Sequence, residues 1–215
     1  MGLQFEVNSQ PSGLIDNANG KTYFGYQAGL NNTGSDNSFF GNLAGKANTT
    51  AIFNTFVGAY SGQAVTTGGF NTYIGGNSGQ ATTTGNNNTL LGFNSGFSNT
   101  TGYANTFVGV NSGTNNLIGK YDTFIGIGAG ASNLTDNNTF VGAEAGSSTT
   151  TGAGNCFLGY NTGNLNTTGS ANSFYGEFTG DITPQDLPMH FMDSLPVYQI
   201  PQPILIHLLV TVQEN

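Results

Sequence analysis

The feature that most constrains this 215-residue chain is a nine-residue motif that returns ten times at a nearly fixed interval. The motif typically reads Asn-Thr-φ-φ-Gly-x-x-(Ala/Ser)-Gly, in which φ is an apolar residue. Successive motifs follow a 17-residue interval, and two of the intervals are shorter by one position. Their first glycines are Gly25, Gly41, Gly58, Gly75, Gly92, Gly109, Gly126, Gly142, Gly159 and Gly176. A fixed short period indicates a repeat architecture in which each unit packs on its neighbours.

The two residues before each first glycine form two apolar columns, one aromatic at nine of its ten positions and the other mainly aliphatic. Short runs of aromatic, β-branched and threonine residues bounded by Gly and Asn are typical of strands. A glycine about every fifth residue, with no apolar period of 3.6, excludes helices. We therefore predict an all-β fold, a parallel β-solenoid (β-roll) of about ten 17-residue coils, with a length on the order of 50 Å. The pairs expected in the core and at an interface are Phe56 and Val57, Tyr73 and Ile74, Phe107 and Val108, Phe124 and Ile125, and Phe140 and Val141.

The chain divides into three segments. Residues 1–20 are expected to form an N-terminal cap, because a solenoid otherwise leaves an unpaired strand edge at its end. Residues 21–180 hold the repeats, and residues 181–215 form a distinct tail that contains five of the six prolines and both histidines.

Charge and hydropathy exclude several kinds of partner. Three lysines stand against eleven carboxylates, giving a formal net charge of −8, so nucleic acids and anionic membranes are not expected to bind. No segment approaches the roughly 20 apolar residues of a membrane helix, so membrane insertion is not expected.

Chemistry-bearing residues are scarce. His190 and His207 lie in the tail without an obvious carboxylate partner, and Cys156 replaces a threonine in a strand column, where we expect it to pack as a small residue. The glycines recur as corners, and the Gly-Lys-Thr at residues 20–22 does not complete a phosphate-binding loop, because Ile15 stands where that loop has its first glycine. The sequence predicts no enzyme, no metal site and no cofactor.

Because successive strand residues point to opposite faces, the two apolar columns cannot both face the core. The outward column would form an apolar stripe longer than a soluble monomer usually exposes. Two arrangements could bury the stripe. One is self-association into a homotrimer or filament, which we favour, and the other is the tail folded back over the stripe. The tail itself has a strand-like apolar run whose candidate assembly residues are Ile204, Leu205, Ile206, Leu208, Leu209 and Val210. This run is predicted either to add to a neighbouring subunit in a fibre or to pack on its own rod.

The unit Asn105–Gly113, Asn-Thr-Phe-Val-Gly-Val-Asn-Ser-Gly, resembles the head repeat of YadA-like trimeric adhesins, and similar repeats occur in phage tail fibres and bacterial surface proteins. The resemblance covers residues 21–180. It implies a left-handed parallel β-roll, trimerisation through one apolar face, and attachment to host or matrix. We further expect an extracellular or cell-surface location, with surface glycans or matrix as candidate partners. The adhesin coil is usually shorter than the interval found here, and residues 1–215 contain no heptad stalk or membrane barrel. The expected role is that of a structural or adhesive subunit of a surface fibre or appendage.

Two other functions are open. One is binding to ice or another ordered surface, which a regular threonine ladder favours. The ladder consists of Thr49, Thr66, Thr83, Thr100, Thr150 and Thr167, and it is interrupted by Leu117 and Leu134. Glycan binding would use corner aromatics, for which the candidates are Tyr26, Tyr60, Phe93, Phe97, Tyr103 and Tyr160.

Seven Asn-x-Ser/Thr triplets are candidate glycosylation sites on an exported chain, although a chain so rich in Asn and Thr produces such triplets by chance. They begin at Asn31, Asn48, Asn87, Asn99, Asn133, Asn137 and Asn166.

Overall fold

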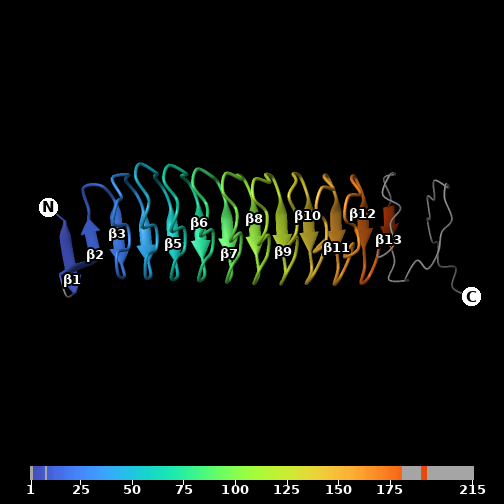
Figure 1. Ribbon diagram of the computed structural model, residues 1–215, viewed down its shortest axis with the longest axis horizontal. Coiled ribbons are helices and arrows are strands. Elements are labelled where there is room, and N and C mark those ends of the chain that lie inside the picture. The colour runs from blue at the N-terminus through green and yellow to red at the C-terminus, as the bar shows by residue number, and fades with distance from the viewer. Residues whose placement is uncertain (1, 8, 181–189, 193–215) are drawn as a thin grey trace, which may run out of the picture.

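The computed structural model describes residues 2–7, 9–180 and 190–192, and every helix or strand element in this part of the chain is a β-strand. Ten short strands, β3 to β12, lie side by side in chain order along a rod (Figure 1). Their bounds are β3 Lys21–Phe24, β4 Ser38–Phe40, β5 Thr55–Val57, β6 Thr72–Ile74, β7 Thr89–Leu91, β8 Thr106–Val108, β9 Thr123–Ile125, β10 Thr139–Val141, β11 Cys156–Leu158 and β12 Ser173–Tyr175.

These ten strands pair in parallel and without a register slip. Phe56 lies opposite Tyr73, for example, so one turn of the chain is a 17-residue step. Two turns are shorter by one position, from Thr22 to Ser38 and from Thr123 to Thr139. The predicted parallel β-solenoid is confirmed, with about nine turns between β3 and β12 and a span of about 43 Å at about 4.8 Å per turn.

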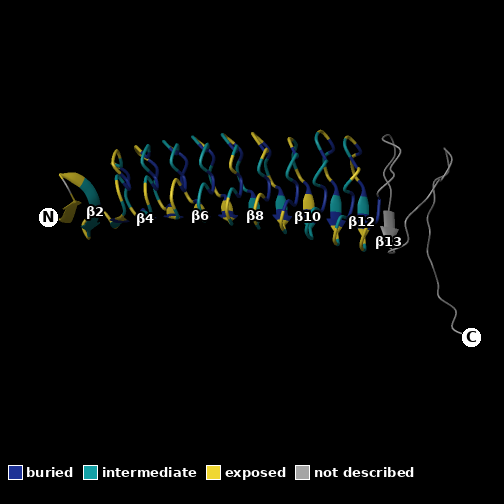
Figure 2. Ribbon diagram, turned by 60° about the horizontal axis from the view of Figure 1, so that its bottom comes forward, coloured by how far each residue is buried: buried dark blue, intermediate teal, exposed yellow. Residues whose placement is uncertain are grey.

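The aromatic column fills the core of the rod. Its members from Phe39 to Phe174 are at most 1 % exposed, and neighbouring rings stack with centroids 4.8–5.0 Å apart. The second glycine of each motif makes room for this stack, because a Cβ at Gly62 would lie 2.5 Å from the ring of Phe56. Figure 2 shows that buried residues, in dark blue, recur in successive turns of the rod. Ring stacking between turns therefore holds the interior in one register.

A buried asparagine ladder runs beside the aromatic column. At Asn71, which precedes β6, Oδ1 accepts the backbone N–H of Asn88 in the next turn at 2.9 Å. Its Nδ2 donates to the carbonyl oxygen of Gly85 at 3.0 Å. The same pair of bonds recurs at Asn54, Asn88, Asn138 and Asn155. Each rung satisfies a buried N–H and a buried carbonyl, which are expensive to leave unpaired.

The first glycine of each motif forms a corner that admits no side chain. Gly109 has φ 139°, and a Cβ there would lie 2.3 Å from the backbone oxygen of Gly126 in the next turn. Residues other than glycine rarely adopt this φ. The close approach of the two backbones explains why glycine occupies this position in all ten motifs.

The two ends of the described rod differ. At the N-terminal end, β1 (Leu3–Val7) and β2 (Gln10–Asp16) form an antiparallel hairpin, and β2 pairs antiparallel with β3. At the other end, β13 (His190–Met192) pairs in parallel with β12, placing Phe191 opposite Phe174 after another 17-residue step. The sheet thus continues into the segment assigned to the tail. The candidate assembly residues 204–210 lie outside the described part of the chain.

Candidate interaction surface on the strand face

Each strand from β3 to β12 turns one aromatic or leucine side chain inward and the residues on either side of it outward. Phe56, Tyr73, Phe107, Phe124 and Phe140 therefore lie in the core, at 0 % exposure. Their neighbours Val57, Ile74, Val108, Ile125 and Val141 lie on the outside. The two columns face opposite ways, as alternation predicts, and the outward one is a surface feature.

We call the outward apolar column the stripe; its members are Phe24, Phe40, Val57, Ile74, Leu91, Val108, Ile125, Val141, Leu158 and Tyr175. Eight of the ten are 36–46 % exposed, and Val108 and Val141 are slightly more buried. The exposure is partial because each side chain is covered above and below by its neighbours in the column. Such a continuous row is unusual on a soluble monomer, which makes the stripe a candidate interaction surface.

A second outward column accompanies the stripe, two residues earlier on each strand, and the two columns together form what we call the strand face. The second column holds Thr or Ser in every strand from β3 to β12 except β11, where Cys156 takes the position. Within the described residues, no hydrogen bond joins the hydroxyls of Thr55, Thr72, Thr89 or Thr106 to another protein group. Their donors and acceptors are free to meet solvent or a bound surface.

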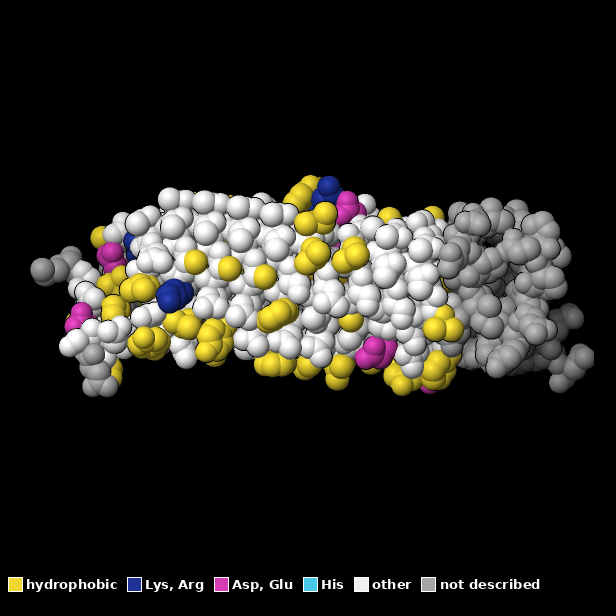
Figure 3. Space-filling model, in the orientation of Figure 1, with side chains coloured by type: hydrophobic (Ala, Val, Ile, Leu, Met, Phe, Trp, Pro, Cys, Tyr) yellow, Lys and Arg dark blue, Asp and Glu magenta, His cyan; other side chains and the backbone are white. Residues whose placement is uncertain are grey.

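The strand face contains no charged residue in either of its columns from β3 to β12. Figure 3 shows one side of the rod, where lysine, aspartate and glutamate side chains are few and apolar side chains recur along the length. The strand face is thus neutral, regular and about 7 Å wide between its two columns, because strand residues rise about 3.3 Å each.

The threonine ladder considered for ordered surfaces lies on another side of the coil, and its hydroxyls are occupied. Oγ1 of Thr49 donates to the carbonyl oxygen of Thr66 at 3.0 Å. Thr66, Thr83 and Thr150 bond to the following turn in the same way. At Leu117 only the carbonyl takes part, accepting from Thr100. These hydroxyls join turns together, so their role is structural.

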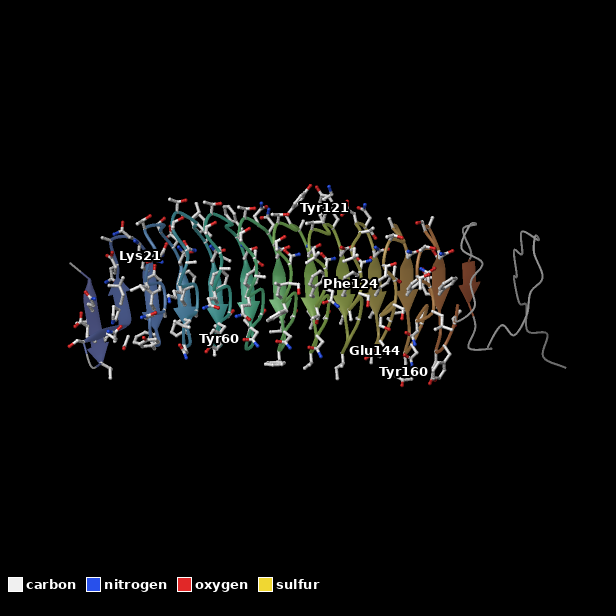
Figure 4. All side chains as sticks on the ribbon, viewed as in Figure 1. Lys21, Tyr60, Tyr121, Phe124, Glu144 and Tyr160 are labelled. Atoms are coloured by element: carbon white, nitrogen blue, oxygen red, sulfur yellow. The ribbon has the colours of Figure 1, made fainter. Side chains whose placement is uncertain are left out.

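The corner aromatics do not form one site. Tyr26, Tyr60, Phe93, Phe97 and Tyr160 are exposed, and Tyr103 is half-buried. In Figure 4 Tyr60 and Tyr160 lie along one edge of the rod, whereas Tyr121 lies on the opposite edge. The ring centroids of Tyr121 and Tyr103 are 5.2 Å apart, so Tyr103 lies near that opposite edge as well. A glycan platform built from all six candidates is therefore ruled out by their placement.

The seven candidate glycosylation sites fall into two groups. Asn48, Asn99, Asn133 and Asn166 are at most 1 % exposed inside the rod, where the folded chain has no space for a glycan. Asn31, Asn87 and Asn137 are exposed. Only these three asparagines suit glycosylation of the folded rod.

Titratable side chains do not gather into a centre. Cys156 lies in the outward threonine column with Sγ 3.8 Å from the hydroxyl of Tyr175, an interaction that raises the pKa of that tyrosine. Among residues 2–7 and 9–180, no group of three His, Cys, Asp or Glu side chains is placed to hold a metal ion. His190 belongs to β13, and His207 lies outside the described residues.

No helix in the described part of the chain is long and apolar enough to span a membrane. In comparisons with known proteins, no family model, curated protein or solved structure matches this chain. The resemblance to adhesin heads, and the left-handed winding it implies, therefore stay predictions.

Proposed function

We propose that this chain is a structural or adhesive subunit of an extracellular surface fibre or appendage, and that it associates with copies of itself through the strand face. The observation that carries the proposal is the stripe, an uncharged apolar row that continues through all ten strands from β3 to β12. A row of this length is matched best by another row of the same length and spacing, which a second copy supplies.

The free energies involved favour such an association. Burying a large apolar side chain fully is worth roughly 1.5–3 kcal/mol, so covering the remaining two fifths of each stripe residue contributes roughly 0.6–1.2 kcal/mol. Twenty stripe side chains from two copies then contribute roughly 12–24 kcal/mol, against an association cost of roughly 4–15 kcal/mol. A pair is favourable over most of these two ranges, and a third copy adds further burial.

Parallel rods about a common axis are the arrangement we favour, because identical turns then meet at one height and the stripe is covered along its length. A closed homotrimer and a filament extended through the tail are both compatible with this geometry. Adhesion to glycans or matrix would then use the sides of the coil that face away from the axis.

The test is the oligomeric state of the wild-type chain and of a stripe variant, measured by sedimentation velocity. Ile74→Lys combined with Ile125→Lys places two charges in the stripe and is expected to yield monomers. The matched control, Thr84→Lys combined with Thr101→Lys, changes exposed residues on another side of the coil and is expected to associate like the wild type. A monomeric wild-type chain, or equal association of both variants, would refute the proposal.

Binding to an ordered surface such as ice is a second candidate, favoured by one observation. The unbonded hydroxyls of the strand-face threonines repeat at the spacing of the turns beside a row of aliphatic groups, which is the regularity that a crystal surface requires. This function needs the strand face to be free, so it predicts a monomer that shows thermal hysteresis. An associated wild-type chain without thermal hysteresis would exclude it.

A further inference from the structure

One rung of the asparagine ladder is a carboxyl group. Asp122 precedes β9 and is 0 % exposed, in the position held by asparagine in the rungs on either side, Asn105 and Asn138. Its backbone N–H donates to Oδ1 of Asn105 at 3.0 Å. Its own Oδ1 accepts the backbone N–H of Asn138 at 2.8 Å. The ladder therefore passes through an acid that no other rung between β4 and β12 contains.

The substitution coincides with an irregularity in the coil. Only two turns between β3 and β12 are shorter than the rest, and they begin directly after Lys21 and after Asp122. These are also the two positions of the ladder column that lack asparagine. Asp122 is thus tied to a local change in the path of the backbone.

Among the described residues, no cation contacts the carboxyl group of Asp122. Oδ2 of Asp122 accepts a hydrogen bond from Nδ2 of Asn116 at 3.0 Å. Asp136 repels the ionised form of Asp122, and Asp136 itself pairs with Lys120, whose ammonium group lies 3.5 Å from it. Tyr121 and Tyr103 lie on the surface beside this ion pair. The ladder positions of the adjoining turns are the neutral Asn105 and Asn138.

We propose that Asp122 is a proton-controlled weak point of the rod, which holds the turns of β9 and β10 together when neutral and loosens that joint when ionised. A neutral carboxyl group resembles an asparagine amide, since it has both an acceptor oxygen and a donor hydrogen. Because Oδ2 of Asp122 faces Nδ2 of Asn116, the neutral form requires the Asn116 amide to turn its oxygen toward that hydrogen. An ionised one is a buried charge, and it lacks the donor that the neighbouring rungs Asn105 and Asn138 have.

Burial raises the pKa of Asp122 to about 7, with Asp136 acting in the same direction and the hydrogen bonds from Asn138 and Asn116 acting against it. A carboxyl group with a raised pKa in the folded state binds its proton more tightly there than in the unfolded chain. Its contribution to stability is complete below the ordinary aspartate pKa and is lost as the pH rises toward the folded value. The unfolding equilibrium constant is therefore expected to increase by up to about tenfold per pH unit between pH 5 and 7 and to level off above that range.

The test compares urea unfolding of the full chain at pH 5 and pH 8 for the wild type, D122N and N71D. The wild type is expected to unfold at lower urea at pH 8 than at pH 5, and D122N to lose most of that difference. The matched variant N71D places a carboxyl group in a regular rung and is expected to acquire a larger pH dependence. A pH dependence that is equal in the wild type and D122N would overturn the proposal, because it would originate at other groups.

A second measurement does not depend on the folding of D122N, in which Asn116 must turn its oxygen toward the new amide. The ¹³C carboxyl signals of aspartate-labelled wild type and D136N are expected to include one that titrates near neutral pH in both proteins. If every aspartate of the folded chain titrates near its ordinary pKa, the weak point does not exist.

Discussion

Phe107 and Val108 are adjacent in one strand, yet they belong to regions of different character. The inward column, to which Phe107 belongs, holds a ring in nine of ten strands, with only Leu90 as an exception. The outward stripe holds Val, Ile, Leu, Phe or Tyr. The inward column is uniform because each ring must stack on the ring above and below and fit against a glycine. The stripe needs only to be apolar, which agrees with the proposal that it packs against a second copy of the chain.

The largest effect on folding is expected at an inward ring. Phe107→Ala removes a side chain with 0 % exposure that stacks on Phe124 at 4.8 Å. It is expected to lower the free energy of unfolding by about 3–5 kcal/mol, measured by urea denaturation. Val108→Ala, its neighbour on the outside, is expected to lower it by less than about 1 kcal/mol in the monomer. Equal losses would mean that the two columns are not distinguished by burial.

Two glycines show the same contrast between packed and open positions, this time in the backbone. Gly109→Ala places a Cβ 2.3 Å from the backbone oxygen of Gly126 at φ 139° and is expected to cost about 2–4 kcal/mol of stability. Gly154 has φ 68°, and no atom lies within 4 Å of the place that a Cβ would take, so Gly154→Ala is expected to cost about 1 kcal/mol. Thermal unfolding of the two variants measures the difference, and a larger loss at Gly154 would contradict it.

The asparagine ladder is expected to give a smaller effect than the ring or the corner. Asn71→Ala removes the acceptor for the N–H of Asn88 and the donor to the carbonyl of Gly85, and we expect a loss of about 2–3 kcal/mol in urea unfolding. Gln80→Ala removes an amide that donates to Gln63 on the surface and is expected to change stability by about 0.5 kcal/mol or less. If Asn71→Ala lowers the free energy of unfolding no more than Gln80→Ala does, the asparagine ladder is not an important source of stability.

The smallest effect on folding is expected on the stripe, where the proposed association predicts a large effect on assembly. Ile74→Ser, at a position 38 % exposed, is expected to alter monomer stability by about 1 kcal/mol or less. It is expected to raise the protein concentration at which oligomers form in sedimentation experiments. A variant that unfolds more readily but associates normally would place Ile74 with the core.

Much of the fold follows from the sequence. The motif interval predicts the turns, and the strands fall where Thr-φ-φ repeats, as at Thr106–Val108. Alternation also predicts that the two apolar columns face opposite ways, but it is symmetrical and does not say which one is inside. The signal that decides is the second glycine, such as Gly113, whose missing side chain leaves space for the ring of Phe107.

Other features could not be predicted because their sequence signals are weak. The hairpin of β1 and β2 reverses the strand direction, and an apolar alternation such as Leu3–Val7 carries no information about direction. β13 lacks the Asn-Thr and glycine of the motif, and its only signal is the 17-residue step from Phe174 to Phe191. The proton sensitivity of Asp122 could not be predicted from the sequence. An aspartate differs from an asparagine by one side-chain group, and the difference affects stability only because Asp122 is buried.

The antiparallel hairpin at one end and the in-register step at every turn have a consequence for how such a chain can change in length. Since each turn bonds to the next through the same backbone groups, duplicating one 17-residue segment would lengthen the rod by about 4.8 Å and leave its cross-section unaltered. The hairpin fixes the N-terminal end of the rod. The length of the rod can therefore be changed in steps of one turn, either in evolution or by design.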